Sequence, residues 1–382
     1  MSERQLEDEC AELIRQLGIK NILIWGYRNR HTYHFIHQGF FRAFQWLSNA
    51  TGVNVEWRDD TEDFTPVGPS TLILTMMNQP RIDEKVELAS DSLLWIHKSG
   101  EPVEHYSRFM DAHGRGQVLF YDEFRRHRDY DANDVYPVLK PVLARVDPPV
   151  PVIYDPNSQL HWYVPSIGQA TLTWGTDLLP HEVLARRDEL TDLMRLRASA
   201  RKVCWVGSVW KPNYERMAAV VEECETRGMH FVQYGNFVIP EFSEALKERG
   251  LDPSRVINKR YVPLEENVDL VGAAVLAPAI QGDNQLSTDG SPSYVPCRLY
   301  KNISYGQLGV SNNPTSELLF GDLVVHGSEM GELIEASSEA LGADDLEDRI
   351  VESMEVVALE HTYISRIHFL LEASLARREY CA

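Results

Sequence analysis

Apolar residues in the first part of the chain gather in short continuous runs separated by stretches of helical period. Such runs predict strands of a parallel sheet, because strands covered on both faces lose the alternation of polar and apolar positions. After the first run, Ile36, Phe40, Phe44 and Leu47 recur at the spacing of one helix face. The candidate strands cover residues 21–26, 53–57, 71–77, 92–97 and 117–122. This alternation predicts a doubly wound α/β unit.

A second alternation of the same kind fills the C-terminal half. A proline-rich segment, residues 136–156, marks a change in composition, and we place the domain linkage between residues 165 and 200. The later predicted strands cover residues 202–207, 229–235, 273–278, 308–312 and 322–327. Helices are expected from about residue 213, near 240–249 and from about Pro296.

The expected fold class is therefore α/β, with two Rossmann-like domains that face a central cleft. We expect an N-terminal domain over residues 1–180 and a C-terminal domain over residues 181–360. A C-terminal helix over residues 361–382 is expected to pack back on the first domain.

Composition and charge narrow the class of protein. The chain has 382 residues, 43% of them hydrophobic and 25% charged, as in a globular protein of two domains. No apolar run approaches the roughly 20 residues needed to span a bilayer, and residues 1–18 form a charged amphipathic pattern rather than a signal peptide. Five scattered cysteines without a CxxC motif predict free thiols. We therefore predict a cytoplasmic protein without a transmembrane segment.

The formal net charge of -20 at pH 7 argues against general binding to nucleic acid, whose phosphates would be repelled. An anionic ligand would need a local cluster of donors.

Residues 291–314, SPSYVPCRLYKNISYGQLGVSNNP, provide such a cluster at the start of a predicted helix. Cations in a first helical turn cost about 0.3–1 kcal/mol each, unless a bound anion reverses the sign. Arg298, Lys301 and Asn302 are spaced to point to one side, which favours a phosphate or diphosphate ligand. The alternative is that the two cations extend into solvent or pair with acids such as Asp289.

A second loop suited to phosphate follows the predicted strand at residues 202–207. Gly207 and Ser208 let backbone N–H groups approach an anion, and Lys211 adds a positive charge before the next helix. Glycine is common in such turns, so one such loop is a weak indication of phosphate binding. Two of them in one domain are a more specific indication.

Several motifs resemble GT-B glycosyltransferases, especially the spore-maturation-type proteins and the large retaining, family 4-like group related to them. Residues 296–314 resemble their "RLFEALACG-plus-strand" element, and HTYISRIHFLLEA at 361–373 is similar to their closing "HTYxxR" helix. KVCWVGS at 202–208 resembles the start of their C-terminal domain, and WGTDLLP at 174–180 the end of their N-terminal one. The resemblance covers about residues 171 to 375.

This resemblance implies that the C-terminal domain binds a nucleoside diphosphate sugar, in UDP or GDP form, and that the acceptor sits on the N-terminal domain. It implies that no metal is needed at the diphosphate, because the helix dipole and basic side chains take its place. The implied donor site comprises Gly207, Ser208, Lys211, Tyr294, Arg298, Lys301 and Asn302, with Tyr261 and Val262 against the base.

The stereochemistry of transfer stays open. Retaining members usually carry two glutamates eight positions apart, where this chain has Ser293 and Lys301. The SYVPCRLYKN pattern is also similar to the donor-binding element of α1,3-fucosyltransferases, which invert.

Candidate chemistry in the first half lies at predicted strand ends. GYRNRHTYHFIHQGF at 26–40 offers Arg28, His31 and His34 for an acceptor or phosphate, although surface and capping roles explain them as well. Histidines three apart drift around a helix and no HExxH is present, so we expect no metal. His97 is either a donor-sugar contact or a buried, hydrogen-bonded histidine. Asp60, with its neighbour Asp59, is a candidate base for an inverting reaction, or a turn cap.

The sequence thus predicts a metal-independent glycosyltransferase that moves a sugar from a nucleotide donor to a hydroxyl of a carbohydrate or glycan acceptor. A homodimer is compatible with it. One alternative is a GT-B sugar-nucleotide epimerase or phosphorylase. Another is a non-enzymatic two-domain protein that binds sugars or nucleotides. The two basic loops argue against this second alternative.

Overall fold

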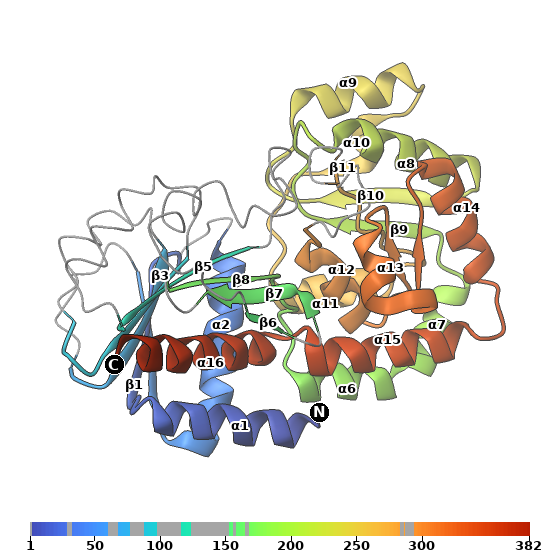
Figure 1. Cartoon of the computed structure of the whole chain (residues 1–382). Coiled ribbons are helices and arrows are strands. Elements are labelled where there is room, and N and C mark those ends of the chain that lie inside the picture. Colours follow the sequence, from blue (N-terminus) through green and yellow to red (C-terminus); the bar gives the residue numbers. More distant parts are fainter. Residues whose placement is uncertain are drawn as a thin grey trace. The chain divides into compact units, whose positions relative to one another are not determined.

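The computed structural model divides the chain into two compact units, each described by itself below (Figure 1). Unit 1 comprises Met1–Leu179 and Thr362–Ala382, and unit 2 comprises Pro180–His361. The structure describes residues 2–28, 33–59, 68–76, 88–97, 116–123, 153–155, 158–164, 168–282, 286 and 294–382.

Unit 1 is built on one sheet whose strand order is β2-β1-β3-β4-β5-β8-β7-β6. Its strands are β1 (Asn21–Trp25), β2 (Asn54–Arg58), β3 (Thr71–Met76), β4 (Leu93–His97), β5 (Val118–Glu123), β6 (Ile153–Asp155), β7 (Ser158–Val164) and β8 (Gln169–Leu172). The first five strands and β8 pair in parallel, which confirms the predicted doubly wound sheet. The central strands β3 and β4 are buried along their whole length, as the continuous apolar runs indicate.

The end of the sheet differs from the prediction. β6 and β7 form an antiparallel hairpin, and β7 pairs antiparallel with β8. The predicted strands do not include these two: β6 lies at the end of the proline-rich stretch and β7 just after it. Proline cannot donate to a ladder, but an outermost strand such as β6 leaves one side of its backbone unpaired and tolerates prolines beside it.

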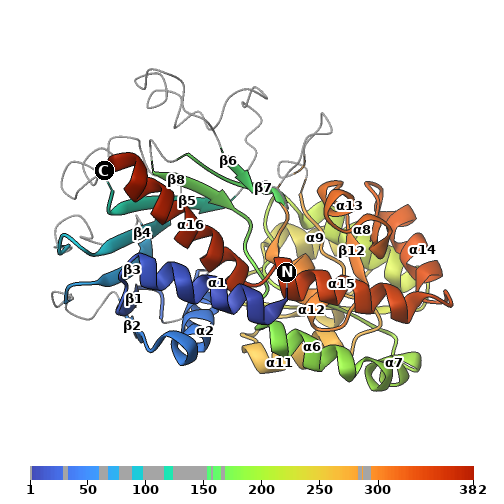
Figure 2. The same ribbon diagram turned by 60° about the horizontal axis from the view of Figure 1, so that its bottom comes forward.

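In the described part of unit 1, the helices are α1 (Glu3–Gln16), α2 (His34–Thr51) and α16 (Tyr363–Cys381). Ser2 caps α1 by accepting a hydrogen bond from the backbone N–H of Gln5 at 3.2 Å. α16 runs beside α1 and also packs on α2 (Figure 2). The ring of Tyr363 fills the space that a side chain at Gly39 would take, and Trp95 Nε1 donates to Ser374 Oγ at 2.8 Å. The last helix of the chain is therefore part of the core of unit 1.

Two sequence motifs meet in unit 1 where the chain leaves and re-enters it. Thr176 and Thr362 form an isolated parallel bridge. Arg366, fully buried, donates from Nε to the Thr173 carbonyl at 2.6 Å and from Nη2 to the Thr173 hydroxyl at 2.9 Å. The WGTDLLP and HTYISR segments thus stabilise each other through backbone and guanidinium hydrogen bonds.

Unit 2 contains parallel strands in an order typical of Rossmann folds. Its strands are β9 (Lys202–Val206), β10 (His230–Tyr234), β11 (Ile257–Asn258), β12 (Gly309–Ser311) and β13 (Val324–His326). β11-β10-β9 form one sheet and β12-β13 another. Bridges Val203–Leu276 and Ala279–Ser311 insert residues 276–279 between β9 and β12. If the strands are numbered along the chain, with residues 276–279 as the fourth strand, their order in the sheet is 3-2-1-4-5-6. This order reverses direction between β9 and the fourth strand. Doubly wound folds bind their ligands at such a reversal.

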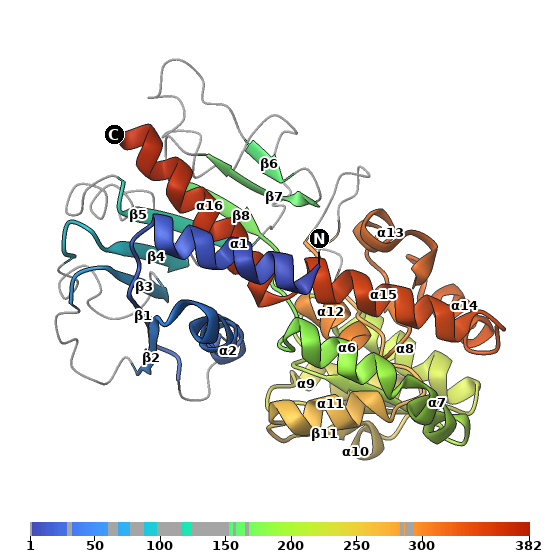
Figure 3. The ribbon, with the colours of Figure 1, turned by 90° about the horizontal axis from the view of Figure 1, so that it is seen from below.

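The helices of unit 2 bury apolar stripes predicted by their period, such as Leu346, Ile350 and Met354 in the acidic C-terminal region. They are α6 (Pro180–Asp188), α7 (Leu190–Ala198), α8 (Tyr214–Thr226), α9 (Pro240–Glu248), α10 (Pro253–Val256), α11 (Leu264–Gly272), α12 (Cys297–Ser304), α13 (Thr315–Phe320), α14 (Met330–Ala340) and α15 (Leu346–Glu360), with a 3-10 turn at Gly321–Leu323. α8 packs on α9 and α14, and α15 packs on α6 and α12 (Figure 3). None of the helices described is both long and apolar enough to cross a bilayer.

Candidate functional site

At the strand reversal of unit 2, an arginine from α12 packs against the end of β9. Arg298, in the first turn of α12, lays its guanidinium carbon 3.6 Å from the centre of the Trp205 ring. Its Nε donates to the Val206 carbonyl at 3.2 Å. A side chain from the helix after the fourth strand is therefore fixed against the end of the first strand, at the topological switch point.

Gly207 is required where this arginine lies. Its φ of +149° is a conformation that side-chain-bearing residues rarely adopt, and a Cβ there would overlap Nη2 of Arg298. The neighbouring loop also comes close, because a Cβ at Gly235 would lie 2.5 Å from the Gly207 carbonyl oxygen. Gln233 Nε2 donates to that same oxygen at 2.7 Å. The two glycines let the loops after β9 and β10 meet under the guanidinium.

Arg298 carries a positive charge that no carboxylate of the described residues compensates by an ion pair. Its contacts are the Trp205 ring and the Val206 carbonyl. Burial lowers the pKa of Arg298 from 12.5 to about 10, because desolvation penalises the charged form. The side chain therefore stays protonated at neutral pH and can pair with an anion. Asp289, the alternative partner considered from the sequence, lies outside the described residues.

A buried amide network fixes the start of α12, and it was not predicted from the sequence. The Tyr294 carbonyl accepts from Gln281 Nε2 at 2.8 Å and from Asn313 Nδ2 at 2.7 Å. Asn313, fully buried, also donates to Gln281 Oε1 at 2.6 Å and accepts from the Thr315 N–H at 2.9 Å. The consecutive amides of Asn312 and Asn313 after a predicted strand were the available signal, because buried amides at a strand end need several partners.

The other predicted donor-site residues of α12 take different positions. Lys301 is partly exposed on the same helix. Asn302 is only 5% exposed and donates from Nδ2 to the Ala277 carbonyl at 2.6 Å. This amide fastens α12 to the fourth strand, because a buried carbonyl needs a donor. A phosphate contact is therefore not among the roles that we propose for Asn302.

The remaining predicted donor residues lie in loops at the carboxyl ends of β9 and β11. Ser208 is partly exposed and Lys211 is exposed, both in the loop that joins β9 to α8. Tyr261 has 37% of its surface exposed, while Val262 is buried, in the loop that joins β11 to α11. These loops belong to the same sheet edge as Gly207, because parallel strands end on one side.

Unit 1 brings two predicted acceptor-side residues together at Trp57, the last buried residue of β2. Arg28 Nη1 donates to the Trp57 carbonyl at 3.2 Å, and the His34 ring stacks on the indole with centroids 5.3 Å apart. Nδ1 of His34 lies 3.0 Å from the Tyr27 carbonyl, and Tyr27 itself has a positive φ of 57°. His31 and Asp60 lie outside the described residues. Arg28 and His34 thus gather at the carboxyl ends of β1 and β2.

His97 lies inside unit 1 at the end of β4. Only 1% of its surface is exposed, and its ring packs against Tyr33, Tyr121 and Trp174 with centroids 5.5, 5.4 and 4.8 Å away. This enclosure favours the buried histidine over a contact with a donor sugar, which stays a prediction.

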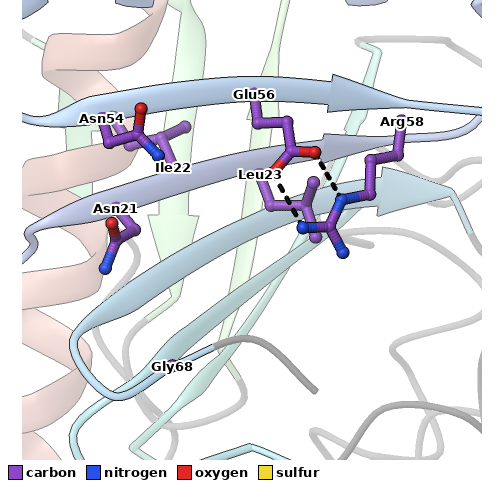
Figure 4. Close-up of a pocket in the computed structure, with 7 residues that line it drawn as sticks. All are labelled: Asn21, Ile22, Leu23, Asn54, Glu56, Arg58 and Gly68. Atoms are coloured by element: carbon purple, nitrogen blue, oxygen red, sulfur yellow. Dashed lines mark hydrogen bonds and ion pairs between the residues drawn. The ribbon is translucent and has the colours of Figure 1, made fainter. Parts of the chain in front are cut away.

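A hollow of about 280 Å³ lies elsewhere on unit 1, along β1 and β2 (Figure 4). Its one arginine, Arg58, is engaged by a two-pronged ion pair with Glu56, at 2.6 and 2.8 Å. An arginine neutralised by a neighbour on its own strand does not attract an anion. We therefore place the candidate site at Arg298 and Gly207. Within the described ranges, no group of three or more His, Cys, Asp or Glu side chains is arranged to hold a metal ion.

The fold of this chain is similar to that of solved glycosyltransferases. An α-glucosyltransferase in complex with UDP-glucose and DNA containing an abasic site matches 90% of this chain and 95% of its own, with a TM-score of 0.50 and 12% identity. Anabaena HepE in complex with UDP-glucose matches 93% and 99%, with a TM-score of 0.51 and 12% identity. A trehalose-6-phosphate synthase studied with bisubstrate glycomimetics matches 91% and 97%, with a TM-score of 0.51 and 8% identity.

No protein-family model matches the sequence, and neither does any curated protein. At identities of 8–12% the structural likeness concerns the fold. It confirms the predicted GT-B fold, and what the chain does has to be argued from its site.

Proposed function

We propose that the chain is a glycosyltransferase that moves a sugar from a nucleoside diphosphate sugar to a hydroxyl of a carbohydrate or glycan acceptor. The diphosphate would lie on unit 2 against Gly207 and the guanidinium of Arg298. Ser208, Lys211 and Lys301 would add donors to its oxygens, and Tyr261 and Val262 would line the base. The acceptor would bind on unit 1, where Arg28 and His34 gather.

One observation carries the proposal: a positive charge without a carboxylate partner among the described residues lies at the switch point of a doubly wound unit. Burial penalises the charged form of Arg298, and a bound anion would offset that penalty. A diphosphate is suited to this place because it offers several oxygens to one planar guanidinium and to the N–H groups of the glycine loop.

The arginine would act on the leaving group. As the bond between the sugar and the diphosphate breaks, negative charge grows on the departing oxygen, and a fixed guanidinium stabilises it more than it stabilises the bound donor. The amide network around Asn313 holds the start of α12, so the charge is in place before the reaction. We propose that no metal ion is needed for this step.

The first donor to test is UDP-glucose, because two of the similar structures are complexes with it. GDP sugars are the second choice. All five cysteines are free, which suits the reducing conditions of a cytoplasm, where we propose that the protein acts.

Isothermal titration calorimetry with UDP and GDP, with and without EDTA, tests the site. We expect one of them to bind with an affinity that EDTA leaves unchanged, and Arg298→Met to weaken it roughly 10- to 100-fold, the range for one charge-assisted hydrogen-bonded contact. Arg187→Met is the matched control, because Arg187 is compensated by Asp188 and Glu355 at 3.0 and 2.9 Å. Equal affinity in Arg298→Met and the wild type would overturn the site.

Turnover is then measured by NMR with the donor alone and with added saccharides. Transfer to a saccharide hydroxyl is the expected reaction. A donor whose sugar changes configuration without any acceptor would instead identify an epimerase and contradict the proposal.

A further inference from the structure

Exposed aromatic side chains of unit 2 gather at the edge of the sheet that carries the site. Trp210, Phe237 and Tyr261 are the exposed Trp, Phe and Tyr side chains in the described part of this unit, at 47%, 43% and 37%. Each follows a different strand, β9, β10 or β11. Exposed aromatic rings on a monomer surface are expected to be scattered, so their common edge indicates a binding function.

Two of these rings form a preformed stack. Trp210 and Phe237 lie with ring centroids 4.1 Å apart and planes inclined by 26°. Their loops are tied together beneath the rings, because Val209 N–H donates to the Phe237 carbonyl at 3.1 Å and Ile239 N–H donates to the Val209 carbonyl at 3.2 Å. Since the loops are already joined, a ligand would lose little free energy in ordering the rings.

The stack is close to the proposed diphosphate site along both loops. Trp210 is three residues beyond Gly207, and Phe237 is two residues beyond Gly235, where an added Cβ would overlap the Gly207 carbonyl oxygen. Three residues span at most about 10 Å, which is the reach of roughly one sugar unit beyond a diphosphate. A ring held on this stack would therefore lie within about 10 Å of the chain at Gly207, close enough to take part in the same site.

We propose that the outer face of the Trp210–Phe237 stack binds a pyranose ring of the acceptor. Aromatic faces carry partial negative charge, and one face of a pyranose presents C–H groups with partial positive charge. The exposed side chain of Asn236, next to Phe237 in sequence, can donate to a hydroxyl group at the rim. The inference rests on the proposed function, which assigns the base of the donor to the loop after β11. It adds an acceptor subsite on unit 2 to that function.

Saturation-transfer NMR on the whole chain with UDP tests this inference. The probes are methyl β-D-glucopyranoside, methyl β-D-galactopyranoside and methyl α-D-mannopyranoside. For at least one probe, we expect the strongest saturation on the hydrogens of one ring face. Trp210→Leu and Phe237→Leu keep apolar bulk but remove a ring, and each should weaken binding of that probe about 3- to 10-fold. Tyr380→Leu, at a tyrosine 57% exposed on α16, is the matched control and should change nothing.

The outcomes separate this inference from the proposed function. If UDP binds and none of the three probes does, or if both leucine variants retain full probe binding, the acceptor subsite is refuted and the donor site stands. If Trp210→Leu lowers the saturation of the uracil ring instead, the stack holds the base, which also overturns the inference. If the wild-type protein binds neither UDP nor GDP, the proposed function itself fails. Because both rings are exposed, unchanged thermal melting of the variants is expected and confirms that they are folded.

Discussion

Replacing Arg298 with methionine distinguishes a ligand-binding arginine from a structural one, because the two predict opposite changes in the stability of the free protein. Methionine keeps the apolar stem over Trp205 and removes the charge. A structural arginine would leave its partners unsatisfied when removed. If the arginine instead binds an anionic ligand, its removal takes an uncompensated charge out of the free protein.

The magnitude follows from the environment of the guanidinium. Burial lowers the pKa of Arg298 from 12.5 to about 10, and one pKa unit corresponds to about 1.4 kcal/mol, so retaining the charge costs about 3 kcal/mol. The contact with the Trp205 ring offsets about 0.5–2 kcal/mol and the hydrogen bond to Val206 about 1–2 kcal/mol. Partial exposure reduces the cost further. The net effect is that Arg298→Met should leave the free protein as stable as the wild type or up to about 2 kcal/mol more stable.

Urea denaturation with and without saturating UDP measures this effect. We expect the midpoint of the free Arg298→Met protein to equal or exceed that of the wild type, while the increase that UDP produces shrinks. A loss of more than about 1 kcal/mol in the free variant, together with an undiminished response to UDP, would refute the reasoning and make Arg298 a structural residue.

The remaining predictions concern the glycine loop and the cysteines. Gly207→Ala should lose most nucleotide affinity in calorimetry, because the new Cβ displaces the guanidinium; an affinity within twofold of the wild type would contradict the geometry. Cys297, partly exposed beside the arginine, and Cys381, exposed, should react quickly with Ellman's reagent in the native protein, and UDP should slow the reaction of Cys297 alone. Burial raises the pKa of Cys204 and of Cys224 to about 12, so both thiols should stay unreactive at pH 8. These thiols ionise in the unfolded chain near pH 9 but not in the folded one, so the free energy of unfolding should fall as the pH rises from 9 towards 11. Replacing both with alanine should flatten that decline in urea titrations, and an unchanged slope would count against the buried thiols as its cause.

Local regularities in the sequence predicted much of the fold. The apolar runs at residues 71–77 and 92–97 correspond to β3 and β4, and helical spacing identified the buried side of α2. These predictions succeeded because burial on both faces of a strand, or on one stripe of a helix, leaves a period that neighbouring residues reveal. The β6–β7 hairpin was not among the predicted strands; it lies at the edge of the sheet, and β6 falls within the proline-rich stretch.

The candidate site was predicted in part. Residue types and helix electrostatics singled out Arg298 and Gly207 as separate features of two distant loops. That Asn302 turns inward to the Ala277 carbonyl, while Arg298 reaches the end of β9, depends on how α12 sits on the sheet. A helical spacing of four residues allows both side chains to share one side, but it does not say what that side meets.

By itself, the sequence determined the alternation of strands and helices and the presence of two α/β units, and it singled out the loops proposed to bind an anion. Only the tertiary structure decided that Gly207 and Arg298 touch, and that Trp210 and Phe237, 27 positions apart, stack on each other. The physical reason is that periodicity records how each residue is buried, whereas contacts between loops depend on the order of the strands in the sheet. That order is fixed by long-range packing, and here it places the ends of β9, β10 and the fourth strand side by side.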